Sequence, residues 1–150
     1  MNYNDLTTEK TNKNSRHLDR MTTREIVRVI NDEDKTVPFA VERELDDISR
    51  AIDLIADRLR NGGRLIYIGA GTSGRLGIID ATECPPTYGV SPELIQGVIA
   101  GGHPAMFRSS EGMEDIAEDA AADLDAVGFS SKDVCMAISA SGTAAYCRGA

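Results

Sequence analysis

Glycine and hydroxyl residues follow a short apolar run near the middle of the chain. Gly69, Gly71 and Gly74 have the spacing G-x-G-x-x-G, and Thr72 and Ser73 lie between the last two. A loop of this kind between a strand and a helix presents backbone N–H groups and hydroxyls at a helix N-terminus, where anions bind. The pattern predicts a cradle for a single phosphate, formed by Gly71, Thr72, Ser73 and Gly74.

The same glycine spacing is typical of dinucleotide-binding folds, which also need an acidic residue near the end of the second strand. This chain has Ala100-Gly101-Gly102-His103 at that place. The missing acid favours a single phosphate over a dinucleotide cofactor. A tight turn that needs glycine only for its backbone geometry is the structural alternative.

A second loop repeats the combination of hydroxyls and glycine. Ser139-Ala140-Ser141-Gly142 follows another apolar run, and ligands of open α/β sheets bind at the carboxyl ends of the strands. We therefore expect Ser139 and Ser141 to contact the same ligand as the first loop. Arg75 either adds positive charge beside the phosphate or is a solvated helix residue.

Two carboxylates are candidates for acid–base chemistry. Glu83 stands before the rigid run Cys84-Pro85-Pro86, which can hold a carboxylate in the fixed geometry that a general acid or base requires. Its alternative is a surface glutamate in a turn. Glu114 lies in the first turn of a predicted helix, where an acidic residue also serves simply to complement the helix dipole.

The elements that must position these residues alternate between strands and helices. Apolar runs ending in glycine or serine predict three buried strands, and 3.6-residue periodicity predicts the helices between them. We expect strands at 65–68, 94–100 and 134–139, and helices at 75–81, ended by Cys84-Pro85-Pro86, and at 111–127. This order implies an α/β fold with a three-layer parallel sheet and right-handed crossovers.

Helices precede the sheet. A capping box at Thr22 predicts a short helix that frays in the polar run 31–35, and a second helix runs from Pro38 to Leu59. Residues 1–20 are polar and are expected to form an arm. We thus expect an N-terminal arm with helices at 1–60 and a partial domain at 61–150, whose three-stranded sheet is incomplete at its C-terminal side.

Composition excludes several classes of function. The net charge of −8 and the pI near 4.7 argue against nucleic acids and anionic membranes as partners. Three cysteines without framework spacing indicate a reducing compartment, and His17 and His103 lack the spacing of metal ligands. Without a membrane-length apolar run or a leader pattern, the chain is expected to be cytoplasmic.

The run 68–77, Ile-Gly-Ala-Gly-Thr-Ser-Gly-Arg-Leu-Gly, continues at 80–89 with Asp-Ala-Thr-Glu-Cys-Pro-Pro-Thr-Tyr-Gly. Together with 30–38 and 99–102, it closely resembles the signature of N-acetylmuramic acid 6-phosphate etherases. The resemblance implies a fold of the sugar-isomerase (SIS) type, a homodimer, no cofactor and a role in recycling cell-wall amino sugars. The implied reaction releases D-lactate and leaves N-acetylglucosamine 6-phosphate.

The resemblance also implies roles for the two carboxylates, with Glu83 as general acid and Glu114 as general base. Because a general acid must be protonated near neutral pH, we expect Glu83 to be buried near a second anion. The chain departs from the family after Gly142, where Thr143-Ala144-Ala145-Tyr146 replaces Arg-Thr-Pro-Tyr. Alternatives to a lyase are a non-catalytic sugar-phosphate sensor and an inactive, truncated etherase.

Overall fold

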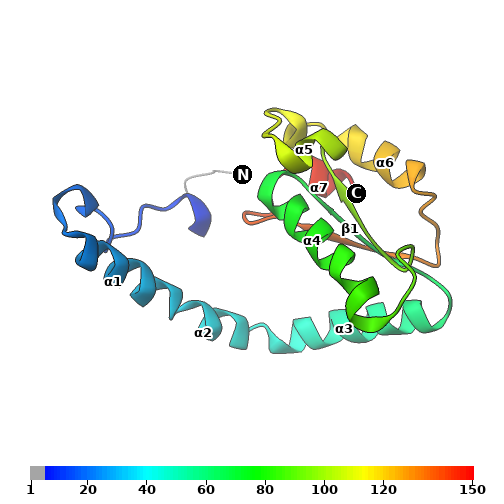
Figure 1. Cartoon of the computed structure of the whole chain (residues 1–150), viewed down its shortest axis with the longest axis horizontal. Coiled ribbons are helices and arrows are strands. Elements are labelled where there is room, and N and C mark those ends of the chain that lie inside the picture. The colour runs from blue at the N-terminus through cyan, green and yellow to red at the C-terminus, as the bar shows by residue number, and fades with distance from the viewer. Residues whose placement is uncertain (1–5) are drawn as a thin grey trace. The chain divides into compact units, whose positions relative to one another are not determined.

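The computed structural model describes residues 6–150 of the chain. The chain divides into two compact units, Met1–Asp53 and Leu54–Ala150 (Figure 1). The predicted arm begins in the first five residues, which lie outside the described ones. Its described part contains two 3-10 helices, η2 (Thr7–Glu9) and η3 (Leu18–Arg20).

Helix α1 (Thr23–Asp34) starts at the predicted capping box. The Thr22 hydroxyl accepts a hydrogen bond from the backbone of Glu25, whose carboxylate accepts one from the Thr22 backbone. The predicted fraying is wrong, because the helix continues through Asp34. A 2.7 Å ion pair between Lys35 and Asp32 supports its last turn.

The predicted single helix from Pro38 to Leu59 is two helices, α2 (Val37–Glu42) and α3 (Leu45–Arg60). The Arg43 guanidinium donates to the carbonyl of Phe39, which the next helical turn would otherwise use. A tighter turn, closed by the 2.9 Å hydrogen bond from Glu44 N to Val41 O, separates α2 from α3.

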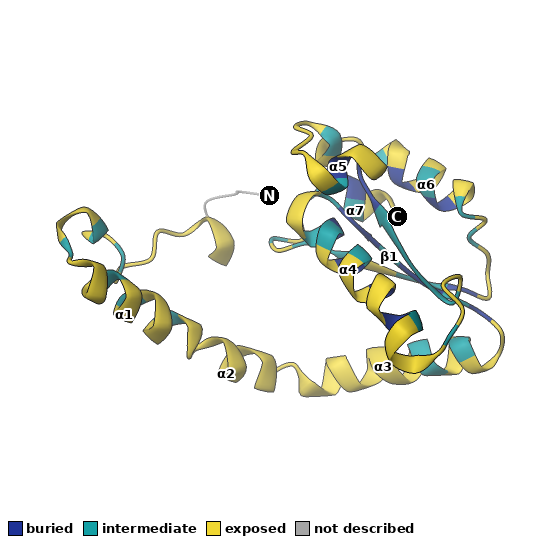
Figure 2. Ribbon diagram, viewed as in Figure 1, coloured by how far each residue is buried: buried dark blue, intermediate teal, exposed yellow. Residues whose placement is uncertain are grey.

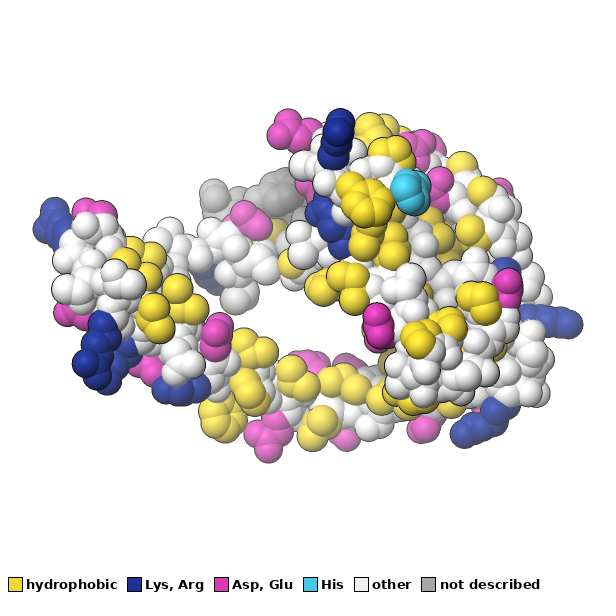
Figure 3. Space-filling view, viewed as in Figure 1, with side chains coloured by type: hydrophobic (Ala, Val, Ile, Leu, Met, Phe, Trp, Pro, Cys, Tyr) yellow, Lys and Arg dark blue, Asp and Glu magenta, His cyan; other side chains and the backbone are white. Residues whose placement is uncertain are grey.

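None of the residues in α1, α2 and α3 is buried (Figure 2). Figure 3 shows hydrophobic side chains on the surface along α2 and α3. Phe39 is 63% exposed and Ile52 is 58% exposed. Such apolar surface on amphipathic helices is typical of an interface with another chain or another part of the protein.

The second unit is built on a parallel sheet, as predicted. Its strands are β1 (Leu65–Gly69), β2 (Ile95–Ile99) and β3 (Val134–Ile138), in the order β2-β1-β3. In the register, Leu65 pairs with Ile95 on one side and with Val134 on the other. All three carboxyl ends therefore meet at one edge of the sheet.

Helices cover both faces of this sheet and complete the predicted three layers. Helix α4 (Gly71–Tyr88) packs on one face, against β1 and β2. The other face carries α6 (Ala117–Ala126) and α7 (Ala145–Gly149), which enclose a core that includes Ile66, Ile68 and Tyr146. The Tyr146 hydroxyl donates to Asp123 of α6 at 2.6 Å.

The expected end of the helix at Cys84-Pro85-Pro86 is wrong, since α4 continues to Tyr88 and is capped by Gly89 in the left-handed conformation. Ala81 and Cys84 are buried in this part of the helix, so packing against the sheet offsets the backbone hydrogen bonds that the prolines cannot donate. Glu83 thus lies inside a helix.

The expected helix at 111–127 is also divided. Gly112 has a φ of +78°, a 3-10 helix η4 (Met113–Asp115) follows, and Ile116 is extended before α6 begins. A short helix α5 (His103–Phe107) precedes this segment. Glu114 therefore lies in η4 and not in the first turn of α6.

A buried ion pair joins the start of β1 to the start of β3. Arg64 Nη2 lies 2.8 Å from Asp133 Oδ2, and the Asp133 side chain is 3% exposed. Asp133 also accepts from the backbone N–H groups of Arg64 and Ser130. The Arg64 guanidinium, together with these donors, holds the pKa of Asp133 far below its ordinary value of 3.8.

Replacing Asp133 with asparagine is expected to lower the free energy of unfolding by about 3 kcal/mol at pH 7. Because the folded-state pKa is depressed, the stabilisation is complete above the ordinary value of 3.8 and is lost as the pH falls below it. In urea titrations from pH 7 to 2, the free energy of unfolding should therefore fall more steeply in the wild type than in the variant. The matched control is exposed Asp125→Asn; equal losses in both variants would contradict this role.

Candidate functional site

The predicted phosphate cradle lies at the N-terminal end of α4. Ala70 is the N-cap residue, and the first helical hydrogen bond runs from Gly74 N to Ala70 O at 3.1 Å. The N–H groups of Gly71, Thr72 and Ser73 precede it and lack helical acceptors. The loop is shorter than predicted, because these three residues already form the first turn of the helix.

The motif glycines differ in their structural roles. A Cβ on Gly74 would lie 2.8 Å from the side chain of Ile99, and one on Gly69 would lie 2.8 Å from Gly74 N. These two glycines let the helix approach the strand closely. Gly71 has open space around it and a φ of +53°, so it makes the left-handed turn that aims the helix N-terminus outward.

The second predicted loop follows β3, the neighbour of β1. Within it, Gly142 N donates to Ser139 Oγ at 3.1 Å, and the hydroxyls of Ser141 and Thr143 lie 2.6 Å apart. The connection after β1 leads to one face of the sheet, and the connection after β3 leads to the other face. Open α/β sheets bind ligands in the crevice between two such strands, outside their carboxyl ends. The structure thus puts the Ser139–Thr143 loop at the same sheet edge as the cradle.

A cavity of about 180 Å³ opens beside the cradle. Gly71, Arg75 and Glu114 line it, together with the segment 109–113. Arg75 is half-buried, so the solvated alternative is wrong, and its guanidinium donates to backbone carbonyls of the α5 region. Sequence reasoning missed this arrangement, because the contact joins residues about 30 positions apart.

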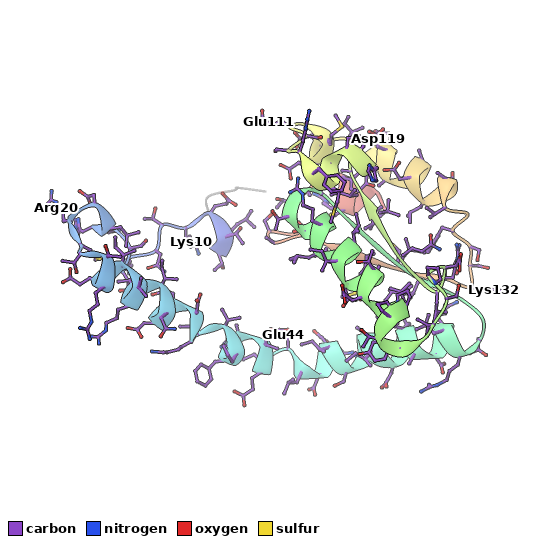
Figure 4. All side chains as sticks on the ribbon, viewed as in Figure 1. Lys10, Arg20, Glu44, Glu111, Asp119 and Lys132 are labelled. Atoms are coloured by element: carbon purple, nitrogen blue, oxygen red, sulfur yellow. The ribbon has the colours of Figure 1, made fainter. Side chains whose placement is uncertain are left out.

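Glu114 is exposed and lies at this cavity. Burial raises the pKa of the Cys147 thiol on α7, and the carboxylate of Glu114 adds a smaller rise. Glu114 is thus near α7 as well as the N-terminal end of α4. Figure 4 labels Glu111, which lines the same cavity.

Glu83 lies elsewhere. It is an exposed residue of α4, 12 positions after Gly71, or roughly 18 Å along the helix axis. The burial that we expected around it is absent among the described residues. Within one chain, the structure therefore brings Glu114 to the cradle and leaves Glu83 three turns away.

A second acidic residue of α4, Asp80, was not singled out from the sequence. Its carboxylate accepts a 2.7 Å hydrogen bond from the hydroxyl of Tyr67 on β1. Burial, followed by this bond, raises the pKa of Tyr67 above its ordinary value. The pair connects the middle of the helix to the sheet.

Comparison with known proteins identifies the family of the chain. The family model described as the glucokinase regulatory protein N-terminal SIS domain matches residues 47–150. The chain belongs to this SIS family. The match includes all three strands and both predicted loops of the site.

The relatives of this SIS chain include curated N-acetylmuramic acid 6-phosphate etherases. This chain is 54% identical over 149 residues to the etherase from Clostridium beijerinckii, and the match covers 99% of this chain and 49% of the relative. The relative from Symbiobacterium thermophilum is 56% identical over 146 residues, covering 97% and 48%. The predicted resemblance is confirmed, and the chain spans about half the length of these relatives.

Among residues 6–150, no group of three or more His, Cys, Asp or Glu side chains is arranged to hold a metal ion. Within the same described range, no helix has the length and apolar character needed to cross a membrane.

Proposed function

We infer that this chain is part of a lyase that cleaves the D-lactyl ether of N-acetylmuramic acid 6-phosphate. The products are N-acetylglucosamine 6-phosphate and D-lactate, and the setting is amino-sugar recycling in the cytoplasm. The observation that carries the proposal is the identity of more than half of the residues to curated etherases along almost the whole chain. The cradle and the second loop at one sheet edge support it.

The proposed chemistry needs one base and one acid. Opening of the sugar ring yields an aldehyde that acidifies the C2 proton, and Glu114 removes this proton. The electron pair forms the C2–C3 double bond as the C3–O bond breaks, and Glu83 protonates the departing lactyl oxygen. Water then adds to the double bond, so no cofactor is needed. Gly71, Thr72, Ser73 and Gly74, with Ser139 and Ser141, hold the substrate phosphate and hydroxyls.

Because Glu83 lies far from the cradle within one chain, the proposed site also needs a second copy of the chain. A single phosphosugar is much shorter than the separation between Glu83 and Gly71 along α4. A homodimer in which each site takes Glu114 from one protomer and Glu83 from its partner resolves this separation. The exposed apolar side chains of α2 and α3 offer surface for such an association.

Mixing two inactive variants tests this arrangement. In the chain extended to the length of its relatives, Glu83→Gln and Glu114→Gln should each lower the rate of D-lactate release by about 10³-fold. Co-expressed, they should recover about a quarter of wild-type activity, because half of the dimers are mixed and each mixed dimer keeps one intact site. No recovery, with mixed dimers verified by mass spectrometry, would exclude a shared site.

The alternative is a non-catalytic sugar-phosphate sensor, which the exposure of Glu83 favours. A sensor binds N-acetylglucosamine 6-phosphate equally well with Glu83→Gln and releases no D-lactate at any chain length. Release by the extended chain but not by these 150 residues would instead identify an inactive front half of an etherase.

A further inference from the structure

Arg75, in the second turn of α4, reaches across to the end of α5. Its Nε donates to the carbonyl of Met106 at 3.0 Å, and its Nη2 donates to those of Ala105 at 2.7 Å and Arg108 at 3.4 Å. The last carbonyls of a helix have no intrahelical donor, so the guanidinium satisfies groups that would otherwise need water. The planar fork of arginine can serve several carbonyls at once, which a lysine ammonium cannot do in the same geometry.

The segment after α5 depends on few other contacts. Residues 108–112 are all exposed and contain no helix or strand. At its far end, Met113 packs against the buried core of the sheet. A Cβ placed on Gly101 would lie 3.2 Å from Met113 and 3.5 Å from Ser110, so the segment folds closely over that glycine. Arg75 and Met113 are thus its two anchors, and Glu114 follows the second one.

We propose that Arg75 is a positioning residue that fixes the segment 108–113 and thereby holds Glu114 beside Gly71. The cavity is lined by Arg75, by this segment and by Glu114, so the anchored backbone forms one wall of the candidate site. The positioning itself rests on the contacts above. Only its effect on catalysis rests on the proposed function, in which Glu114 is the base.

Hydrogen exchange tests the positioning without any need for activity. In Arg75→Met, the amides of Arg108 and Asp115, which donate to the carbonyls of Pro104 and Gly112, should exchange at least tenfold faster, while those of β1 stay unchanged. Arg75→Lys should give an intermediate rate, and Arg148→Met, which removes an exposed guanidinium from α7, should have no effect. Unchanged exchange in the segment, or equal acceleration throughout β1, would overturn the proposal.

Kinetics of D-lactate release in the extended chain test the consequence for Glu114. Arg75→Met should lower kcat by about 10²-fold, because a base displaced by about 1 Å loses its alignment, with little change in KM. On a Glu114→Gln background the same substitution should have almost no further effect, since both changes act through one group. Additive losses would overturn the link to Glu114. A wild type that releases no D-lactate would refute the proposed function and leave the exchange rates to decide on Arg75.

Discussion

Replacing Glu114 with glutamine is expected to lower the rate of D-lactate release by about 10³-fold, within the usual range for the loss of a general base. The amide has almost the same shape as the carboxylate but cannot accept the C2 proton. Because Glu114 is exposed and makes no side-chain hydrogen bond among the described residues, the fold should be unaffected. The measurement is the initial rate of D-lactate formation by the extended chain.

Two additions make this result specific. Glu118→Gln, an exposed carboxylate in the first turn of α6, is the matched control and should retain full activity. Exchange of the C2 proton with deuterated water should disappear in Glu114→Gln but persist in Glu83→Gln, since only the base removes that proton. Persistent exchange in Glu114→Gln would assign the base to another group.

Replacing Ser73 with aspartate is expected to weaken binding of N-acetylglucosamine 6-phosphate by about 100-fold, or about 3 kcal/mol. The added carboxylate sits in the first turn of α4, where it competes for the free N–H groups and repels the phosphate. The same charge favours the helix dipole, so the free energy of unfolding should stay equal or rise. The affinity measured by calorimetric titration should therefore fall, while the free energy of unfolding measured in urea should not.

The matched control is Ser73→Asn, because asparagine has nearly the same volume as aspartate but carries no charge. Its affinity should remain within about threefold of the wild type, because only the charge repels phosphate. Equal weakening by aspartate and asparagine would indicate a steric effect. Unchanged affinity in Ser73→Asp would place the phosphate away from the cradle.

Local patterns predicted the strands and the start of the first helix correctly. β1, β2 and β3 are short apolar runs, and the parallel order follows from the helices between them. The capping box at Thr22 needs only residues within one turn. These features depend on neighbours in sequence, which is why the sequence alone predicts them.

The errors arise where packing from distant residues decides the structure. Pro85 and Pro86 predict a helix end, but the burial of Ala81 and Cys84 against the sheet keeps α4 intact. The length of α4 in turn sets the distance of Glu83 from the cradle, so the grouping of the two carboxylates could not be predicted from their motifs. Each motif was recognisable, whereas their relative placement depends on the fold.

The most direct test of phosphate binding at the N-terminal end of α4 is an amide NMR titration of this chain with N-acetylglucosamine 6-phosphate, with N-acetylglucosamine and inorganic phosphate as comparison ligands. If the cradle holds the phosphate, the phosphosugar should shift the amide signals of Gly71, Thr72 and Ser73 most strongly, followed by those of 139–143, and the neutral sugar should have little effect. Shifts confined to other parts of the chain, or equal responses to both sugars, would contradict the assignment of the cradle at α4.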